Sequence, residues 1–286
     1  MKKARWMLCI SMVLFGTLGP FVRAIGVSSG ELALYRAVLA TLTIGGVLLI
    51  TGQKIPFAKI KREVPLLLLS GAAMGINWIL LFEAYKYTTV STATLSYYFA
   101  PVLVMVVCPI LFREKLSLLQ LVCFVMSTLG LVLITGFGMK GGTDLLGIGF
   151  GLGAAVFYAA VILLNKFIQN VTGLHRTFLQ FLAAIVVLVP YVACTSGVTL
   201  GNLNGIGWVS LLIVGLVHTG VAYCLYFPSV NELPGQKTAL LSYLDPLVAV
   251  LLSVTVLGES MSPWQYAGGA LILGFTLLNE LTPKKE

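Results

Sequence analysis

The chain has 286 residues, of which 58% are hydrophobic and only 10% are charged, and its mean hydropathy is +1.00. An ordinary soluble domain carries about 45–50% apolar and about 25% charged residues. Because so few charges could not cover the surface of a soluble protein of this length, the composition excludes that class. It predicts a polytopic membrane protein.

Long apolar runs follow one another along the chain. A helix needs about 20 mostly apolar residues to cross the hydrocarbon core, whereas a β-barrel would show short strands of alternating polarity. The connections between the runs are short, so no soluble domain is expected. We predict an all-α membrane protein with ten transmembrane helices, at residues 6–25, 32–51, 64–86, 91–112, 117–136, 145–166, 176–195, 207–228, 237–257 and 263–281.

The positive charges predict the orientation of these helices. No small-x-small cleavage site follows the opening MKKARW, so we expect an uncleaved first helix. With the N-terminus in the cytoplasm, 14 of the 18 Lys and Arg residues fall on the cytoplasmic side. Ten spans then place the C-terminus there too. Topology thus accounts for the net charge of +8, and no nucleic-acid partner is expected.

Sequence patterns for catalysis, metals and cofactors are missing. The five cysteines are scattered singly, and the sequence contains no CxxC, HExxH, GxSxG, Walker loop or GxGxxG pattern. We therefore expect no metal, no cofactor and no enzyme activity. The glycine-rich stretch GIGFGLG (147–153) instead fits close helix–helix packing, through Gly147 with Gly151 and Gly149 with Gly153.

The second half of the chain repeats the first at an offset of 145 residues. The offset pairs Trp78 with Tyr223, Tyr98 with Tyr243, Pro101 with Pro246, Glu114 with Glu259 and Gln120 with Gln265. Each half holds five spans, and because five is odd the second half must cross the membrane in the opposite sense. We predict two inverted repeats, residues 1–140 and 141–286, as secondary transporters use for alternating access.

Two stretches carry a family resemblance. The stretches are TTVSTATLSYYFAPVLVMVVCPILFREKLSLLQLVCFVMSTLGLVLI (88–134) and LPGQKTALLSYLDPLVAVLLSVTVLGESMSPWQYAGGALILGFTLL (233–278). Each combines a small-residue helix start, a mid-helix proline, an acidic residue and Ser-x-x-Gln. They resemble the two copies of the EamA module of the drug/metabolite transporter superfamily. The resemblance covers essentially the whole chain. It implies a secondary transporter or exporter of small metabolites with a central cavity between the repeats.

Pro101 and Pro246 are expected to break their helices at corresponding places in the two halves. Proline removes one backbone hydrogen bond, and in lipid the freed carbonyl must be satisfied by protein or by cavity water. Such paired breaks point to a transport site; the alternative is a kink that only helps packing. Glu114 and Glu259 each precede a helix, and we expect them to cap the N–H groups of its first turn.

Asp245 is not shared between the repeats, because it pairs with Ala100. It lies near the middle of its span, where an aspartate is about 2.5–3.5 kcal/mol unfavourable. Helical spacing places it on one face with Thr238 and Ser242. It could provide the counter-charge of a substrate amine or carry a coupling proton, since burial favours the neutral carboxyl group. The alternative is a structural partner for a buried cation or for helix N–H groups.

The remaining candidates for a substrate site are aromatic or basic. Trp78, Tyr97 and Tyr223 could contact an amine through cation–π interactions, or could simply pack or sit at the membrane interface. Arg36 could hold a substrate carboxylate or snorkel to the outer interface. His218 could titrate, or could hydrogen-bond a neighbour.

Together these features predict a secondary active transporter in the bacterial inner membrane. The favoured function is export of an amino acid or related small metabolite by alternating access, with protons as the candidate coupling ion. A second hypothesis is an importer of a cationic nutrient such as a quaternary amine. A membrane-embedded enzyme or receptor is the alternative of another class, but neither clustered catalytic residues nor a signalling domain is present. The expected partners are the lipid bilayer and an amine-bearing small molecule.

Overall fold

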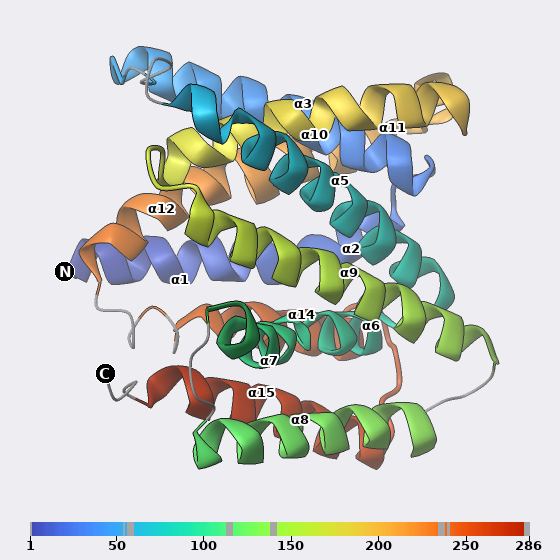
Figure 1. Ribbon diagram of the computed structural model, residues 1–286. Coiled ribbons are helices and arrows are strands. Elements are labelled where there is room, and N and C mark those ends of the chain that lie inside the picture. The colour runs from blue at the N-terminus through green and yellow to red at the C-terminus, as the bar shows by residue number, and fades with distance from the viewer. Residues whose placement is uncertain are drawn as a thin grey trace.

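The regular elements of the protein are all helices (Figure 1). A computed structural model describes residues 2–53, 55, 60–112, 117–137, 142–233, 238 and 241–282, and no strand occurs in these ranges. The elements are α1 (Lys2–Gly16), α2 (Leu18–Arg23), α3 (Ser29–Ile50), η1 (Lys61–Glu63), α5 (Val64–Tyr87), α6 (Val90–Tyr97), α7 (Ala100–Phe112), α8 (Leu118–Phe137), α9 (Gly142–Phe167), α10 (Gly173–Cys194), η2 (Leu200–Asn202), α11 (Gly205–Leu212), the π-helix η3 (Ile213–Val221), α12 (Ala222–Glu232), α14 (Leu244–Thr255) and α15 (Pro263–Leu281).

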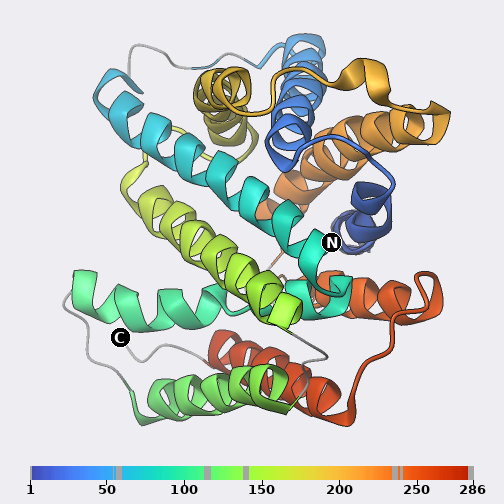
Figure 2. The same cartoon turned by 90° about the vertical axis from the view of Figure 1, so that its right-hand side faces the viewer.

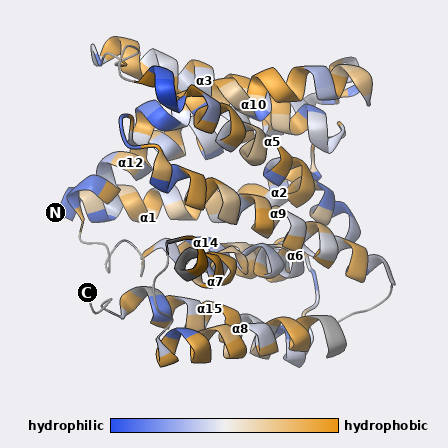
Figure 3. Ribbon diagram, viewed as in Figure 1, coloured by the Kyte–Doolittle hydropathy of each residue, from blue (hydrophilic) through white to orange (hydrophobic). Residues whose placement is uncertain are grey.

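Many of these helices are long and apolar enough to cross a membrane. Figure 3 shows hydrophobic residues along most of their length. Among the described residues, seven segments are candidate spans, and two shorter apolar helices, Leu118–Ile134 and Leu244–Thr255, accompany them. The prediction of an all-helical, multi-pass membrane protein is confirmed, whereas the count of ten spans stays a prediction. The seven segments are Lys2–Arg23, Ser29–Ile50, Lys61–Tyr87, Val90–Val107, Gly142–Phe167, Gly173–Cys194 and Gly205–Glu232.

The helices form a bundle with one flanking pair. Helices α8 and α15 pack against each other at the bottom of Figures 1 and 2. In the rest of the bundle α5 contacts α9 and α10, α3 contacts α10 and η3, and α1 contacts α12 and α14. Helix α6 lies between α9 and α14 and contacts both. Segments from the two halves of the sequence are therefore interleaved.

Several of the membrane-spanning segments are interrupted within their length. A turn at residues 98–99 separates α6 from α7, and Tyr243 is a turn residue immediately before α14. These two breaks lie at positions that the 145-residue offset relates. Thr17 likewise separates α1 from α2. Backbone hydrogen bonds persist at the turns, from Thr17 to Val13 at 3.0 Å and from Tyr98 to Thr94 at 2.9 Å. The breaks therefore redirect the helices without leaving these N–H groups unpaired.

The two Ser-x-x-Gln motifs form helix caps. The Ser262 hydroxyl accepts from the Gln265 backbone, and the Gln265 side chain accepts in return from the Ser262 backbone, at 3.2 and 2.8 Å. Ser117 and Gln120 make the same reciprocal pair, also at 3.2 and 2.8 Å. Such a capping box satisfies two orphan N–H groups of the first turn. It therefore marks where α8 and α15 begin.

The glycine-rich stretch of α9 packs closely at some positions and not at others. A Cβ added at Gly147 would lie 2.7 Å from Cβ and Cγ2 of Thr88, and one at Gly151 would lie 3.0 Å from Cβ of Ser96. A Cβ at Gly153 would approach Leu80 to 3.3 Å, but one at Gly149 would meet nothing within 4 Å. Close packing is thus confirmed for Gly147, Gly151 and Gly153. It is wrong for Gly149, which faces away.

We expect Gly147→Ala to destabilise the protein and Gly149→Ala not to. The new methyl group at position 147 would also lie 2.9 Å from the backbone nitrogen of Thr88, which cannot move freely. Overpacking of this kind costs about 1–3 kcal/mol, whereas alanine at an open helical position is favourable. The measurement is the melting temperature of the purified protein in detergent. Equal effects of the two substitutions would contradict the packing described here.

Candidate substrate site

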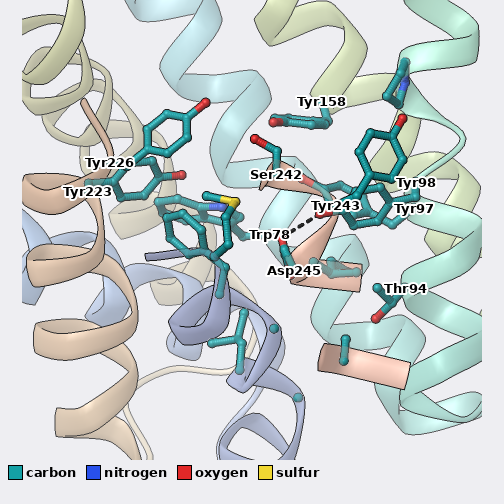
Figure 4. Close-up of a pocket in the computed structure, with 18 of the residues that line it drawn as sticks. Trp78, Thr94, Tyr97, Tyr98, Tyr158, Tyr223, Tyr226, Ser242, Tyr243 and Asp245 are labelled. Carbon is teal, nitrogen blue, oxygen red and sulfur yellow. Dashed lines mark hydrogen bonds between the residues drawn. The ribbon is translucent and has the colours of Figure 1, made fainter. Parts of the chain in front are cut away.

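The bundle encloses a cavity of about 590 Å³, within the range of small-molecule sites. It extends from the middle of the bundle toward the end where α12 finishes, where Leu233 and Thr238 line it. Toward the opposite end its lining stops at Gly19, Tyr85 and Thr94. Figure 4 shows aromatic side chains on two facing sides, with Asp245 between them.

Asp245 lines this cavity from the first turn of α14. The hydroxyl group of Tyr98 donates to its Oδ2 atom at 2.6 Å, drawn as a dashed line in Figure 4. Ser242 also lines the cavity, and its hydroxyl group donates to the Thr238 carbonyl oxygen at 2.8 Å. The break before α14 thus brings a carboxylate and hydroxyl groups to one wall of the cavity.

Arg36 provides the opposite charge in the same cavity. Its side chain is only 4% exposed, and its Nε donates to Oγ1 of Thr219, in the π-helix η3, at 2.7 Å. The guanidinium carbon lies 4.5 Å from the ring centroid of Trp78, at cation–π distance. Snorkelling to the outer interface is therefore the wrong alternative for Arg36. No ion pair joins Arg36 directly to Asp245, both of which the structure describes, so each charge can face a ligand.

Aromatic rings make up much of the cavity wall. Trp78, Tyr97 and Tyr223, the three predicted candidates, all line it. Trp78 and Tyr223 are linked through Phe181, whose ring centroid lies 5.2 Å from that of Trp78 and 5.6 Å from that of Tyr223. Tyr97 packs against its neighbours on the facing wall at centroid distances of 5.2 and 5.9 Å.

Sequence reasoning missed several tyrosines of this wall. Tyr98 and Tyr243 were paired by the repeat, and their position beside the two prolines is the signal that could have marked them as cavity residues. For the others no local signal exists, because their spans bring them together only in the folded bundle. The missed residues are Tyr85, Tyr98, Tyr158, Tyr226 and Tyr243.

His218 does not line the cavity. It is 2% exposed in η3, and its Nε2 atom lies 2.7 Å from Oγ1 of Thr17, at the break between α1 and α2. Its ring centroid is 4.9 Å from that of Phe21. The candidate role as a substrate ligand is therefore dropped, because the imidazole is already held by neighbouring helices.

Pro101 lines the cavity, and Pro246 is buried beside it in the first turn of α14. Glu259 caps a helix, but not the one that follows it. Its Oε2 accepts from the backbone N–H of Val90 at 2.9 Å, so it caps α6, while Ser262 caps α15. Glu114, the other predicted cap, lies outside the described residues.

Comparison with known proteins identifies the family. The model of the EamA-like transporter family matches the chain twice, over residues 2–136 and 145–280. The chain belongs to the EamA-like transporter family. It is thus a multi-pass membrane transporter of the drug/metabolite transporter superfamily and not an enzyme.

This EamA-like transporter is similar to curated proteins over most of its length. The uncharacterized transporter YxxF of Bacillus subtilis (strain 168) is 34% identical, over 92% of this chain and 85% of its own. The threonine/homoserine exporter RhtA of Escherichia coli (strain K12) is 26% identical, over 94% and 86%. A solved crystal structure superimposes with a TM-score of 0.66 at 17% identity, over 98% and 96%, which shows the fold.

The chemistry of the cavity of this EamA-like transporter is that of recognition. It offers one carboxylate, one guanidinium group, several hydroxyl groups and many aromatic faces. Among the described residues no group of three His, Cys, Asp or Glu side chains lies close enough together to hold a metal ion. Such a cavity suits a small molecule that is transported through the helix bundle.

Proposed function

We propose that this protein is a secondary active exporter of amino acids, or of related metabolites that carry both an amine and a carboxylate, in the bacterial inner membrane. One observation carries the proposal: Asp245 and Arg36 line the same aromatic cavity without pairing with each other. A zwitterion has the charges that complement both. The similarity to the exporter RhtA supports this substrate class and direction.

Asp245 is the proposed partner of the substrate's ammonium group. A charged group near the middle of a membrane helix is kept only where it faces a cavity and serves a function. The tyrosine faces around it add cation–π contacts for an ammonium group. Asp245 is also the candidate proton carrier, since a carboxylate in a low-dielectric site can bind and release a proton.

Arg36 is the proposed partner of the substrate's carboxylate. A guanidinium group presents a planar fork of N–H donors that matches a carboxylate, and it stacks on aromatic rings. In this cavity Nε donates to Thr219, and the guanidinium carbon lies 4.5 Å from the centroid of the Trp78 ring. These two contacts hold the guanidinium group in place, and they leave its terminal N–H groups for a ligand.

Transport is proposed to occur by alternating access of two inverted halves, residues 1–140 and 141–286, with ten spans and both termini in the cytoplasm. The packing of the helices supports this. The 145-residue offset relates α1 to α9, α3 to α10, and both η3 and α12 to parts of α5. The α1–α12 contact thus corresponds to the α9–α5 contact, and the α3–η3 contact corresponds to the α10–α5 contact. Such internal symmetry allows one bundle to adopt two related packings around a fixed central site.

An importer of a cationic nutrient such as a quaternary amine is the competing function. The single carboxylate and the tyrosine faces favour it. Arg36 opposes it, because a buried cation in the same cavity repels a ligand that carries only positive charge. The two functions therefore predict different responses to a carboxylate on the ligand.

The experiment is a ligand screen on the purified protein, read as thermal stabilisation. The panel holds amino acids, the matching amines without the carboxylate, the matching acids without the amine, and quaternary amines. We expect an amino acid to raise the melting temperature more than either matched fragment. Hits are then tested for transport into proteoliposomes with and without a pH gradient. Stabilisation and uptake of a quaternary amine alone would overturn the proposal and favour the importer.

A further inference from the structure

A second cavity, of about 350 Å³, adjoins the central one at the end lined by Tyr85. The end of α2, the start of α3 and the last turns of α5 line it, through residues that include Arg23, Ser29, Phe82, Tyr85 and Lys86. Tyr85 also lines the central cavity. The two cavities are thus neighbours that share one wall residue.

The wall between the two cavities is thin. Tyr85 is 7% exposed and Phe82 is 1% exposed, so both are packed inside the bundle. The ring of Phe82, which lines the second cavity, lies 5.6 Å from the guanidinium carbon of Arg36, which lines the central one. A single layer of side chains on α5 therefore separates the proposed substrate site from the second cavity.

Polar contacts clamp the helix ends beside this wall. Arg23 at the end of α2 forms an ion pair with Glu259 and donates from Nη2 to the Thr88 carbonyl oxygen at 2.7 Å. Glu259 in turn accepts from the Val90 N–H at the start of α6. These contacts tie α2, the end of α5, the start of α6 and the segment after α14 to one another.

The same end of the bundle is also tightly packed. The backbone N–H of Ser91 donates to the hydroxyl group of Ser253 at 3.3 Å, which joins α6 to α14. A Cβ added at Gly19 would lie 2.5 Å from Cγ1 of Val90, so α2 and α6 are in close contact there. The central cavity extends the other way, toward the end lined by Leu233 and Thr238.

We propose that the second cavity is the outer vestibule of the transport path, that Tyr85 is the gate between it and the central cavity, and that the Arg23–Glu259 ion pair holds this gate closed in the present conformation. This inference rests on the proposed alternating-access function. Opening requires Glu259 to release Arg23, so that α2 and α6 separate and the Tyr85 ring leaves the wall. The solute then passes from the central cavity to the vestibule.

The experiment measures access to the central cavity from each side of the membrane. The five native cysteines are replaced, and Ser242→Cys places a reporter thiol in the central cavity. A membrane-impermeant maleimide is applied to spheroplasts, which expose the outer face, and to inverted vesicles, which expose the cytoplasmic face. In the parent we expect fast labelling in inverted vesicles and slow labelling in spheroplasts.

Two matched pairs of variants test the gate and the ion pair. Tyr85→Ala is expected to raise the labelling rate in spheroplasts by about tenfold or more. A minor state, here the one open to the outside, is typically populated at about 0.1–10%, so its population can rise by that factor. Tyr85→Phe, which keeps the ring, leaves the rate unchanged. Glu259→Gln removes the charge, while its amide oxygen can still accept from Val90, and it is expected to raise the same rate. Glu83→Gln, which breaks the ion pair with Lys86 within α5, is expected to leave the labelling rate in spheroplasts unchanged.

The labelling rate in inverted vesicles shows whether each variant is folded. A variant with parental labelling there and unchanged labelling in spheroplasts counts against the role of its residue. If Tyr85→Ala behaves like Tyr85→Phe, or Glu259→Gln like Glu83→Gln, the corresponding part of the proposal is overturned. Because labelling involves no substrate, a failure here is distinguishable from a failure to find an amino acid that is transported.

Discussion

Asp245→Asn is expected to lower transport of the amine-bearing substrate by about 100-fold or more. Removing one partner of a buried charge pair costs about 3–5 kcal/mol, and every 1.4 kcal/mol is about tenfold. Asparagine keeps the size of the side chain and an oxygen that can accept from Tyr98, so the loss reports the charge. Ser242→Ala on the same cavity wall is the matched control. Its hydroxyl group bonds its own helix, and we expect a loss of no more than about tenfold.

The two roles of Asp245 separate in proteoliposomes. Exchange of labelled for unlabelled substrate needs binding but no net proton movement, whereas accumulation driven by a pH gradient needs coupling. Loss of both in Asp245→Asn indicates a substrate ligand, and loss of accumulation alone indicates a proton carrier. A variant that transports like the wild-type protein at every pH would refute the central role of Asp245.

Arg36→Gln is expected to separate zwitterions from amines. Loss of a hydrogen-bonded charge partner costs about 1.5–3 kcal/mol, so amino-acid transport should fall by about tenfold to a hundredfold. The matching amine without the carboxylate should bind as well as before or better, because a repelling cation has gone. Arg36→Lys keeps the charge but loses the planar fork of N–H donors and alters the cation–π contact with Trp78, and should give an intermediate loss.

The measurement for Arg36 is the ratio of the two transport rates in the same vesicles. A general folding defect would lower both rates alike, so the ratio isolates the carboxylate contact. The melting temperature of each variant, measured without ligand, serves as the second control. Equal falls for amino acid and amine would contradict the assignment of Arg36 to the carboxylate.

The helix breaks could be foreseen from the sequence because their cause is local. A proline removes its own N–H and clashes with the preceding turn wherever the helix packs. The interruptions at residues 98–99 and at Tyr243 lie just before Pro101 and Pro246. The apolar runs likewise marked the membrane helices, since hydrocarbon demands about 20 apolar residues from any span.

The position of Arg36 along its helix was harder to predict from the sequence, because the helix begins with polar residues that lie outside the apolar run. The apolar run begins at residue 32, but Ser28 caps α3 and the helix already starts at Ser29, with Glu31 held by Thr199. At 1.5 Å per residue, Arg36 lies about 10 Å along α3 from Ser29, where the helix begins. Arg36, which the apolar run placed near the membrane interface, thus lies deeper in the bundle, because a polar first turn precedes it.

The partner of Glu259 could not have been found from its own surroundings. The capping rule connects an acidic residue with the helix that follows it, and that helix has its own cap in Ser262. The N–H group that Glu259 binds belongs to Val90, which lies far away in the sequence. Only the packing of α6 beside the segment after α14 brings them together, and no local pattern encodes that packing.

The hydrogen bond from Tyr98 to Asp245 links the break in one half of the chain to a helix of the other. The carboxylate thus already has a hydrogen-bond donor within the protein, and the ammonium group of the proposed substrate would replace or join that donor. Binding of that substrate would then exchange one donor for another and would not add a contact to an unpaired carboxylate. A carboxylate without a donor from the protein would bind the substrate more tightly and release it more slowly. The Tyr98 hydroxyl group, which already donates to this carboxylate, instead favours rapid release of the substrate and so a high turnover.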